Sequence, residues 1–328
     1  MCIINRSSTL MNVRRMWIEM NQPLITLFSS PKPFTDAHIN TIQRNAILSW
    51  MKLGDRAEIF LMGDDEGVEE VAEEYGCKHF PDVRCNEKGT PLISSMLDIA
   101  RANSTSPFLC IINTDIIVLP EMLDAVMRVS QKLQQFLMVG QRWDVAISTI
   151  IPTDGFYEHV RKTIQDIGRL HPPMGSDYFI FPRTCYTSIP DFAIGRAGWD
   201  NWMIYKARLE GWKVVDASSD ILIAHQDHDY SHLKDGKPHY RQPETKVNVK
   251  LAGGEHTIFT LHDAQRKLQS GMFKTLPCSW KRFWREVEIF PTTTLKNQAL
   301  ARFSYFLFNP RKAYIAFRQW VNKMRKRK

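Results

Sequence analysis

The chain has 328 residues, of which 44% are hydrophobic and 24% charged, as is ordinary for a soluble globular protein of one large or two medium domains. No apolar run approaches the ~20 residues that span a bilayer, and no signal peptide is predicted. The six cysteines are scattered without C-x-x-C spacing, which indicates a reducing compartment and argues against a disulfide framework or a structural zinc site.

The net charge of +8 is concentrated at the C-terminal end of the chain. Residues 266–328 contain 16 Lys and Arg but only 2 acidic residues, whereas the rest of the chain has more acidic than basic residues. We therefore predict an N-terminal extension (1–21), a main domain (22–265) and a basic, aromatic-rich helical tail (266–328).

Strands and helices are predicted to alternate along the first 120 residues. Short apolar runs predict strands, and apolar residues spaced three and four apart predict helices. The expected order is strand 24–28, helix 36–53, strand 57–62, helix 66–75, strand 78–80, helix 91–102 and strand 108–119. This alternation predicts an open α/β sheet flanked by helices, with a ligand crevice at the carboxyl ends of its strands.

The second half of the chain has a more mixed pattern. The expected elements are helix 122–133, strand 136–140, strand 178–181, a helix through Leu209, and strands 213–216 and 221–224.

The apolar run from Phe108 to Pro120 contains Asn113-Thr114-Asp115. Burying a carboxylate in such a strand is costly unless it is paired or bound to a metal, so a divalent cation is one candidate partner for Asp115. Alternatively, Asp115 only caps the next turn or helix. Asp64 and Asp65 follow the second strand and would lie at the same sheet edge, unless they only form a turn.

Together these segments resemble a GT-A glycosyltransferase, a nucleotide-diphospho-sugar transferase, over about residues 22–262. In that family a strand ends in an Asp-x-Asp motif whose last Asp binds a divalent metal on the sugar-nucleotide diphosphate. Here the motif is Asn113-Thr114-Asp115, in which Asn replaces the first Asp. The resemblance implies a GT-A fold with an open mixed sheet and a Mn²⁺ or Mg²⁺ cofactor.

The resemblance also implies roles for particular residues. The donor would be bound by Thr26, Ser29, Asp64, Asp65, Lys88, Asn113, Thr114 and Asp115. The metal would be held by Asp115 together with His225 or His228. Asp200 would be the catalytic base, or alternatively a helix N-cap. The acceptor would contact Trp143, Asp177, Trp199 and Trp202; the alternative for the last two is a place in the core.

The implied activity is metal-assisted, inverting transfer of a hexosyl group from a nucleotide sugar to a glycan or glycolipid hydroxyl, in surface polysaccharide or glycolipid synthesis. One alternative is a sugar-nucleotide nucleotidyltransferase, which normally has a glycine-rich loop that Ser29 to Pro33 lacks. Another is a non-catalytic carbohydrate-binding protein on the same fold, an alternative motivated by Asn113.

The tail combines basic and aromatic residues, twelve of the latter between 266 and 328. In the last predicted helix Tyr314, Phe317, Trp320 and Met324 share one face. Such a helix is typical of segments that lie in an anionic membrane interface. We therefore expect a cytoplasmic protein, peripheral at the inner face of a membrane. Packing on the acidic body, dimerisation and nucleic-acid binding are the alternatives, and of these we expect no nucleic-acid partner.

Overall fold

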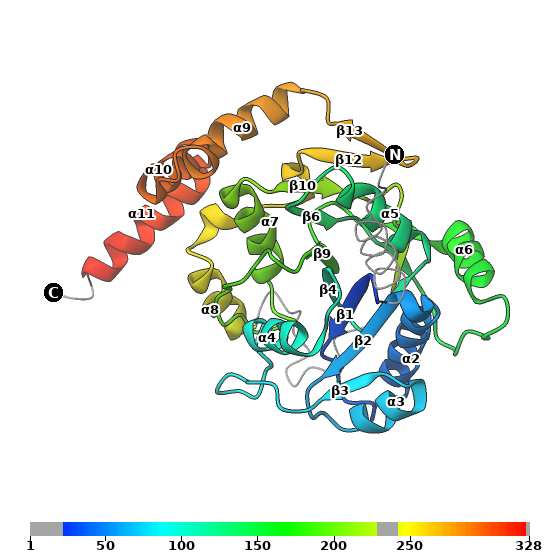
Figure 1. The fold of residues 1–328 in the computed structure, drawn as a ribbon. Helices are drawn as coiled ribbons and strands as arrows, with labels where there is room; N and C mark the ends of the chain where they lie inside the picture. The colour runs from blue at the N-terminus through cyan, green and yellow to red at the C-terminus, as the bar shows by residue number, and fades with distance from the viewer. Residues whose placement is uncertain (1–21, 228–241, 326–328) are drawn as a thin grey trace, which may run out of the picture.

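The computed structural model describes residues 22–227 and 242–325. They form a large sheet with helices on both faces, a smaller sheet beside it, and an arm of helices that projects from this body (Figure 1). All sites discussed below lie on this framework.

The large sheet has nine strands in the order β13-β12-β10-β6-β9-β4-β1-β2-β3. The strands are β1 (Ile25–Ser29), β2 (Ala57–Met62), β3 (Lys78–Phe80), β4 (Phe108–Ile112), β6 (Phe136–Val139), β9 (Tyr178–Pro182), β10 (Lys213–Asp216), β12 (Arg266–Gln269) and β13 (Met272–Thr275). β1 is parallel to β2 and β4, whereas β9 is antiparallel to β4 and β6. The predicted open, mixed α/β sheet is therefore confirmed.

Side chains of the central strands alternate between two hydrophobic cores, as expected for a sheet covered on both faces. In β4, Cys110 and Ile112 face the core that contains α2 and α5, whereas Leu109 and Ile111 face the core that contains α4 and α7. The helices are α2 (Ala37–Met51), α3 (Val68–Tyr75), α4 (Ile93–Asn103), α5 (Glu121–Ser130), α6 (Phe156–Ile167), α7 (Trp199–Glu210) and α8 (Pro243–Leu251), with short 3-10 turns η1 (Gly54–Arg56), η3 (Glu255–Thr257) and η4 (Leu261–Asp263).

The prediction of a single strand over 108–119 is wrong. β4 ends at Ile112, and the chain turns at Asn113, whose carbonyl accepts a hydrogen bond from the Ile116 N–H (3.2 Å). The second half of the run, β5 (Ile116–Val118), belongs to the smaller sheet. This sheet has the strand order β5-β11-β7-β8, and its other strands are β11 (Ile223–Gln226), β7 (Trp143–Val145) and β8 (Arg169–Leu170). Both halves are equally apolar, so composition did not separate them. Asp115 consequently lies at the junction of the two sheets.

The tail is not helical from residue 266. β12 pairs in parallel with β10 and forms a hairpin with β13, so this part of the chain extends the large sheet. The helical arm follows, as α9 (Trp280–Thr293), α10 (Gln298–Phe308) and α11 (Pro310–Arg325). No helix within 22–227 or 242–325 is both long enough and apolar enough to cross a membrane.

Ion pairs join α9 to the body. Arg208 of α7, only 4% exposed, pairs with Glu286 (2.7 Å). Arg285 pairs with the buried carboxylate of Asp263 (2.7 Å). Each pair crosses from the body to the arm, so the first arm helix is held in a defined position.

Candidate active site

The strand register of the smaller sheet brings three candidate metal ligands together. His225 on β11 lies opposite Ile116 of β5 on one side and opposite Asp144 of β7 on the other. Side chains of cross-strand partners lie about 5 Å apart, and Asp115 immediately precedes Ile116. His225 Nδ1 is 3.3 Å from Asp144 Oδ1, and His225 Nε2 is 3.8 Å from Asp115 Oδ2. The predicted neighbours Asp115 and His225 are thus adjacent, and Asp144 joins them.

Asp227 completes this group. The Asp227 N–H donates to the Val145 carbonyl (2.8 Å), and its Oδ1 lies 3.7 Å from His225 Nδ1. One ligand atom each from Asp144, His225 and Asp227 can be chosen so that all lie within 4.8 Å of one another. We call Asp115, Asp144, His225 and Asp227 the carboxylate–histidine cluster. Carboxylate oxygens and an imidazole nitrogen form a donor set that fits a divalent cation.

A buried amide network fixes the strand that carries His225 and Asp227. Gln226 lies between these two residues in the sequence, and its side chain is fully buried and donates to the Ile42 carbonyl (2.7 Å). Its Oε1 accepts a hydrogen bond from Asn45 Nδ2 (3.0 Å). Because buried amides are costly to leave unsatisfied, this network holds β11 in one register.

Two basic side chains, Arg142 and His171, contact Asp144 of the cluster. Arg142 donates from Nε to Asp144 Oδ1 and from Nη1 to Asp177 Oδ1, both at 2.8 Å. His171 Nδ1 lies 2.8 Å from the other Asp144 oxygen. Burial favours a higher pKa for Asp144, but its hydrogen bonds with His225 and His171 and the charge of Arg142 hold that pKa far below its usual range. Asp144 is therefore a carboxylate at neutral pH.

The pKa of His225, the histidine of the cluster, is shifted in the opposite direction, upward. Burial lowers the pKa of His225, but the carboxylates of Asp115 and Asp144 outweigh burial and raise it. This excess of negative charge around His225 is the electrostatic environment that also attracts a cation.

Asn113, which follows β4, is hydrogen-bonded to Asp177, which precedes β9. Asn113 Nδ2 donates to Asp177 Oδ1 (2.9 Å), and the Asn113 N–H donates to the Asp177 carbonyl (3.0 Å). The other carboxylate oxygen of Asp177 is buried and has no hydrogen-bond partner among the described residues. The negative charge missing at Asn113 is thus present on Asp177, directly before the neighbouring strand β9.

Two hydroxyls and a lysine lie at the carboxyl edge near Asp115, and Arg196, which pairs with Glu244 (3.0 Å), lies near that lysine. Ser29 Oγ and Thr114 Oγ1 share a hydrogen bond (2.6 Å). The pKa of Lys32 is lowered, mainly because burial disfavours its charge. The nearby carboxylate of Asp115 opposes this shift, and the guanidinium of Arg196 adds to it. Lys32 and Arg196 were not predicted as site residues, although Lys32 directly follows the polar residues that end the first predicted strand.

Three predicted contacts lie elsewhere. Thr26 is fully buried in β1, where its hydroxyl bonds with Ser104 and Glu58, so it does not reach the sheet edge. Trp199 and Trp202 are 5% and 6% exposed and pack in the core against Phe179 and Phe192, respectively. The donor contact predicted for Thr26 and the acceptor contact predicted for both tryptophans are therefore wrong, because these side chains face protein.

The remaining predicted residues stay predictions. Asp64, Asp65 and Lys88 are exposed on turns after β2 and β3. Trp143 is half-buried on β7, next to Asp144. His228 lies outside the described residues.

Asp200 lies in the first turn of α7. Its Oδ1 accepts a hydrogen bond from the Gly198 N–H (3.0 Å), and Gly198 is the N-cap residue of the helix. Burial is the main cause that raises the pKa of Asp200, and the nearby carboxylate of Asp177 adds to it. Asp200 therefore stabilises the helix start, and its raised pKa also suits a general base.

Comparisons with known proteins give a distant structural likeness. No protein-family model and no curated protein matches the sequence. Glucosyl-3-phosphoglycerate synthase of M. tuberculosis is 16% identical over 80% of this chain and 89% of its own, with a TM-score of 0.44. A structure of that enzyme with Mn²⁺, UDP and glucosyl-3-phosphoglycerate is 14% identical over 80% and 90%, with a TM-score of 0.43. A mycobacterial protein is 15% identical over 79% and 85%, with a TM-score of 0.44.

Proposed function

We propose that this protein is a glycosyltransferase that moves a sugar from a nucleotide-diphosphate donor to a hydroxyl acceptor. The observation that most supports this proposal is the carboxylate–histidine cluster, which draws four candidate ligands from three separate parts of the chain to one sheet edge. Lys32 lies near Asp115 and supplies positive charge for a diphosphate, and Arg196, which pairs with Glu244, lies near Lys32. A cation site next to a basic side chain is an arrangement that suits a leaving nucleoside diphosphate.

On the donor side, the cluster would hold Mn²⁺ or Mg²⁺, which when bound supplies Lewis-acid stabilisation of the diphosphate. Lys32 offsets part of the remaining phosphate charge, and Arg142 keeps Asp144 ionised and oriented. Ser29 and Thr114 present hydroxyls at the same edge. Asp64, Asp65 and Lys88 are further donor contacts in this proposal, as their place after β2 and β3 allows.

On the acceptor side, Asp200 removes the proton of the attacking hydroxyl, and the product has inverted configuration. A carboxylate with a raised pKa holds such a proton better than an ordinary one. Asp177 lies near Asp200, and its unpartnered buried oxygen accepts a hydrogen bond from an acceptor hydroxyl. We expect the acceptor to be a glycan or a glycolipid.

Thermal unfolding with a panel of nucleoside diphosphates, with and without Mn²⁺ or Mg²⁺, tests the donor site. A ligand at 100 times its Kd adds about 2.7 kcal/mol of stability. We expect this gain for one nucleoside diphosphate in the presence of metal, its loss in Asp144→Ala, and its retention in the control Asp166→Ala, which changes an exposed carboxylate on α6. Stabilisation by no nucleotide with either metal would refute the proposal.

Turnover separates the enzyme from the alternatives. Release of the nucleoside diphosphate and transfer of the sugar, abolished in Asp144→Ala, are expected for a glycosyltransferase. Nucleotide binding without sugar turnover would indicate the non-catalytic carbohydrate-binding protein. Release of pyrophosphate from a nucleoside triphosphate and a sugar phosphate would indicate the nucleotidyltransferase.

A further inference from the structure

The arm exposes large apolar side chains along each of its three helices. Trp280, Phe303 and Tyr314, one from each helix, are 74%, 69% and 66% exposed. The other exposed apolar residues of the arm are Phe283, Trp284, Val287, Phe290, Leu295, Leu300, Phe306, Leu307, Ile315, Phe317, Trp320 and Met324. They recur at spacings of three and four in α9 and α11, so they form stripes rather than scattered single residues. An apolar surface of this extent marks an interaction site.

Basic residues flank these stripes. Lys281, Lys296, Arg302, Arg311, Arg318 and Arg325 are exposed on the arm or in its connections. Its two acidic residues, Glu286 and Glu288, are ion-paired with Arg208 and Arg285. The outer surface of the arm is therefore both apolar and strongly positive.

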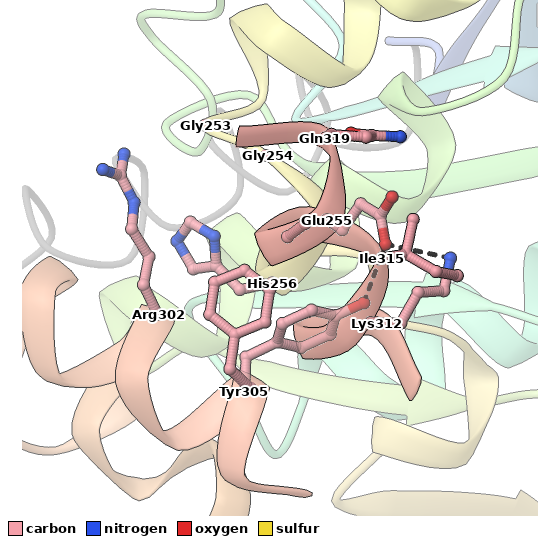
Figure 2. Close-up of a pocket in the computed structure, with 11 residues that line it drawn as sticks. Gly253, Gly254, Glu255, His256, Arg302, Tyr305, Lys312, Ile315 and Gln319 are labelled. Carbon is pink, nitrogen blue, oxygen red and sulfur yellow. Dashed lines mark hydrogen bonds and ion pairs between the residues drawn. The ribbon is translucent and has the colours of Figure 1, made fainter. Parts of the chain in front are cut away.

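The inner side of the arm is already attached to the body. Figure 2 shows Glu255 of η3 accepting a hydrogen bond from Tyr305 of α10 and pairing with Lys312 of α11, each at 3.0 Å. A cavity of about 290 Å³ remains at this junction. Packing against the body thus uses one side of the helices and leaves the aromatic stripes exposed, while the arm as a whole projects away from the body (Figure 1).

We propose that the arm lies in the interface of an anionic lipid bilayer. Its aromatic and aliphatic side chains insert at the boundary between headgroups and acyl chains, while its Lys and Arg side chains contact lipid phosphates. The combination of positive charge and exposed aromatic side chains favours an anionic bilayer as the partner of this surface. The arm of a second copy would present the same positive charge, so pairing between two arms is disfavoured.

Sedimentation of the full chain with lipid vesicles tests the proposal. We expect strong binding to vesicles with roughly 30 mol% phosphatidylglycerol, and at least tenfold weaker binding to pure phosphatidylcholine and to anionic vesicles at high salt. The variant Phe303→Ser/Phe317→Ser should lose binding at least tenfold. The matched control Ile167→Ser/Met174→Ser, which changes two equally exposed apolar residues away from the arm, should bind as the parent does.

A charge-reversal variant, Arg311→Glu/Arg318→Glu, provides a second test that does not depend on the apolar substitutions. It should lose binding to anionic vesicles while its circular dichroism and unfolding midpoint stay unchanged. Absence of binding to anionic vesicles, unchanged binding in both arm variants, or a change in self-association alone would overturn the proposal.

Discussion

Replacing Asn113 by Asp restores the strict Asp-x-Asp motif, yet we expect this change to destabilise the protein. The Asn113 amide donates to Asp177 Oδ1 at 2.9 Å, so a carboxylate there loses the donor and faces a second carboxylate. A hydrogen bond to a charged group contributes about 1.5–3 kcal/mol. Two like charges 4 Å apart repel by about 4 kcal/mol at an effective dielectric constant near 20. Arg142, 2.8 Å from the same oxygen, offsets part of this cost.

We therefore expect Asn113→Asp to lower the free energy of unfolding by about 4 kcal/mol, measured by urea denaturation at neutral pH with a chelator present. Asn113→Ala is the matched control, because it removes the hydrogen bond without adding a charge, and should cost about 2 kcal/mol. The reasoning is refuted if the Asp variant is at least as stable as the Ala variant.

Three further changes probe other parts of the structure. Gln226→Met leaves the partners of a fully buried amide unsatisfied and should cost about 3 kcal/mol in urea denaturation, with a less than additive effect when combined with Asn45→Ala. Burial raises the pKa of Glu244, but the hydrogen bonds that its carboxylate accepts outweigh burial, so the pKa is lowered overall. The stability that Glu244 contributes is therefore present at neutral pH and lost as pH falls through the acid range. The thermal unfolding midpoint of Glu244→Gln should change less between pH 6 and pH 3 than that of the parent. Asp263→Asn removes the buried charge that pairs with Arg285 and should cost about 3 kcal/mol, with faster proteolysis at the arm; unchanged cleavage would contradict a role in holding it.

Local patterns in the sequence predicted the central elements well. The strands over 57–62, 78–80 and 213–216 have the predicted bounds, and Asp36 caps α2 by accepting a hydrogen bond from the Ile39 N–H (2.9 Å). Each of these features depends on residues that are neighbours in the chain. Local pattern was therefore enough to find them.

The site depends on contacts that local pattern does not contain. Asp144 meets His225 only because β7 and β11 pair in one register, although 80 residues separate them along the chain. Trp199 and Trp202 have the spacing both of an exposed aromatic pair and of core residues, and only the packing of α7 on the large sheet decides between these. The sequence therefore predicted Asp115 and His225 as candidate ligands but not their neighbours.

The ion pairs between α9 and the body have a mechanical consequence. Arg208 and Asp263 of the body bind two adjacent residues of α9, so this turn of the helix is fixed in orientation as well as in position. Whatever surface the arm contacts, this attachment limits the orientations in which the carboxyl edge of the sheet can face that surface.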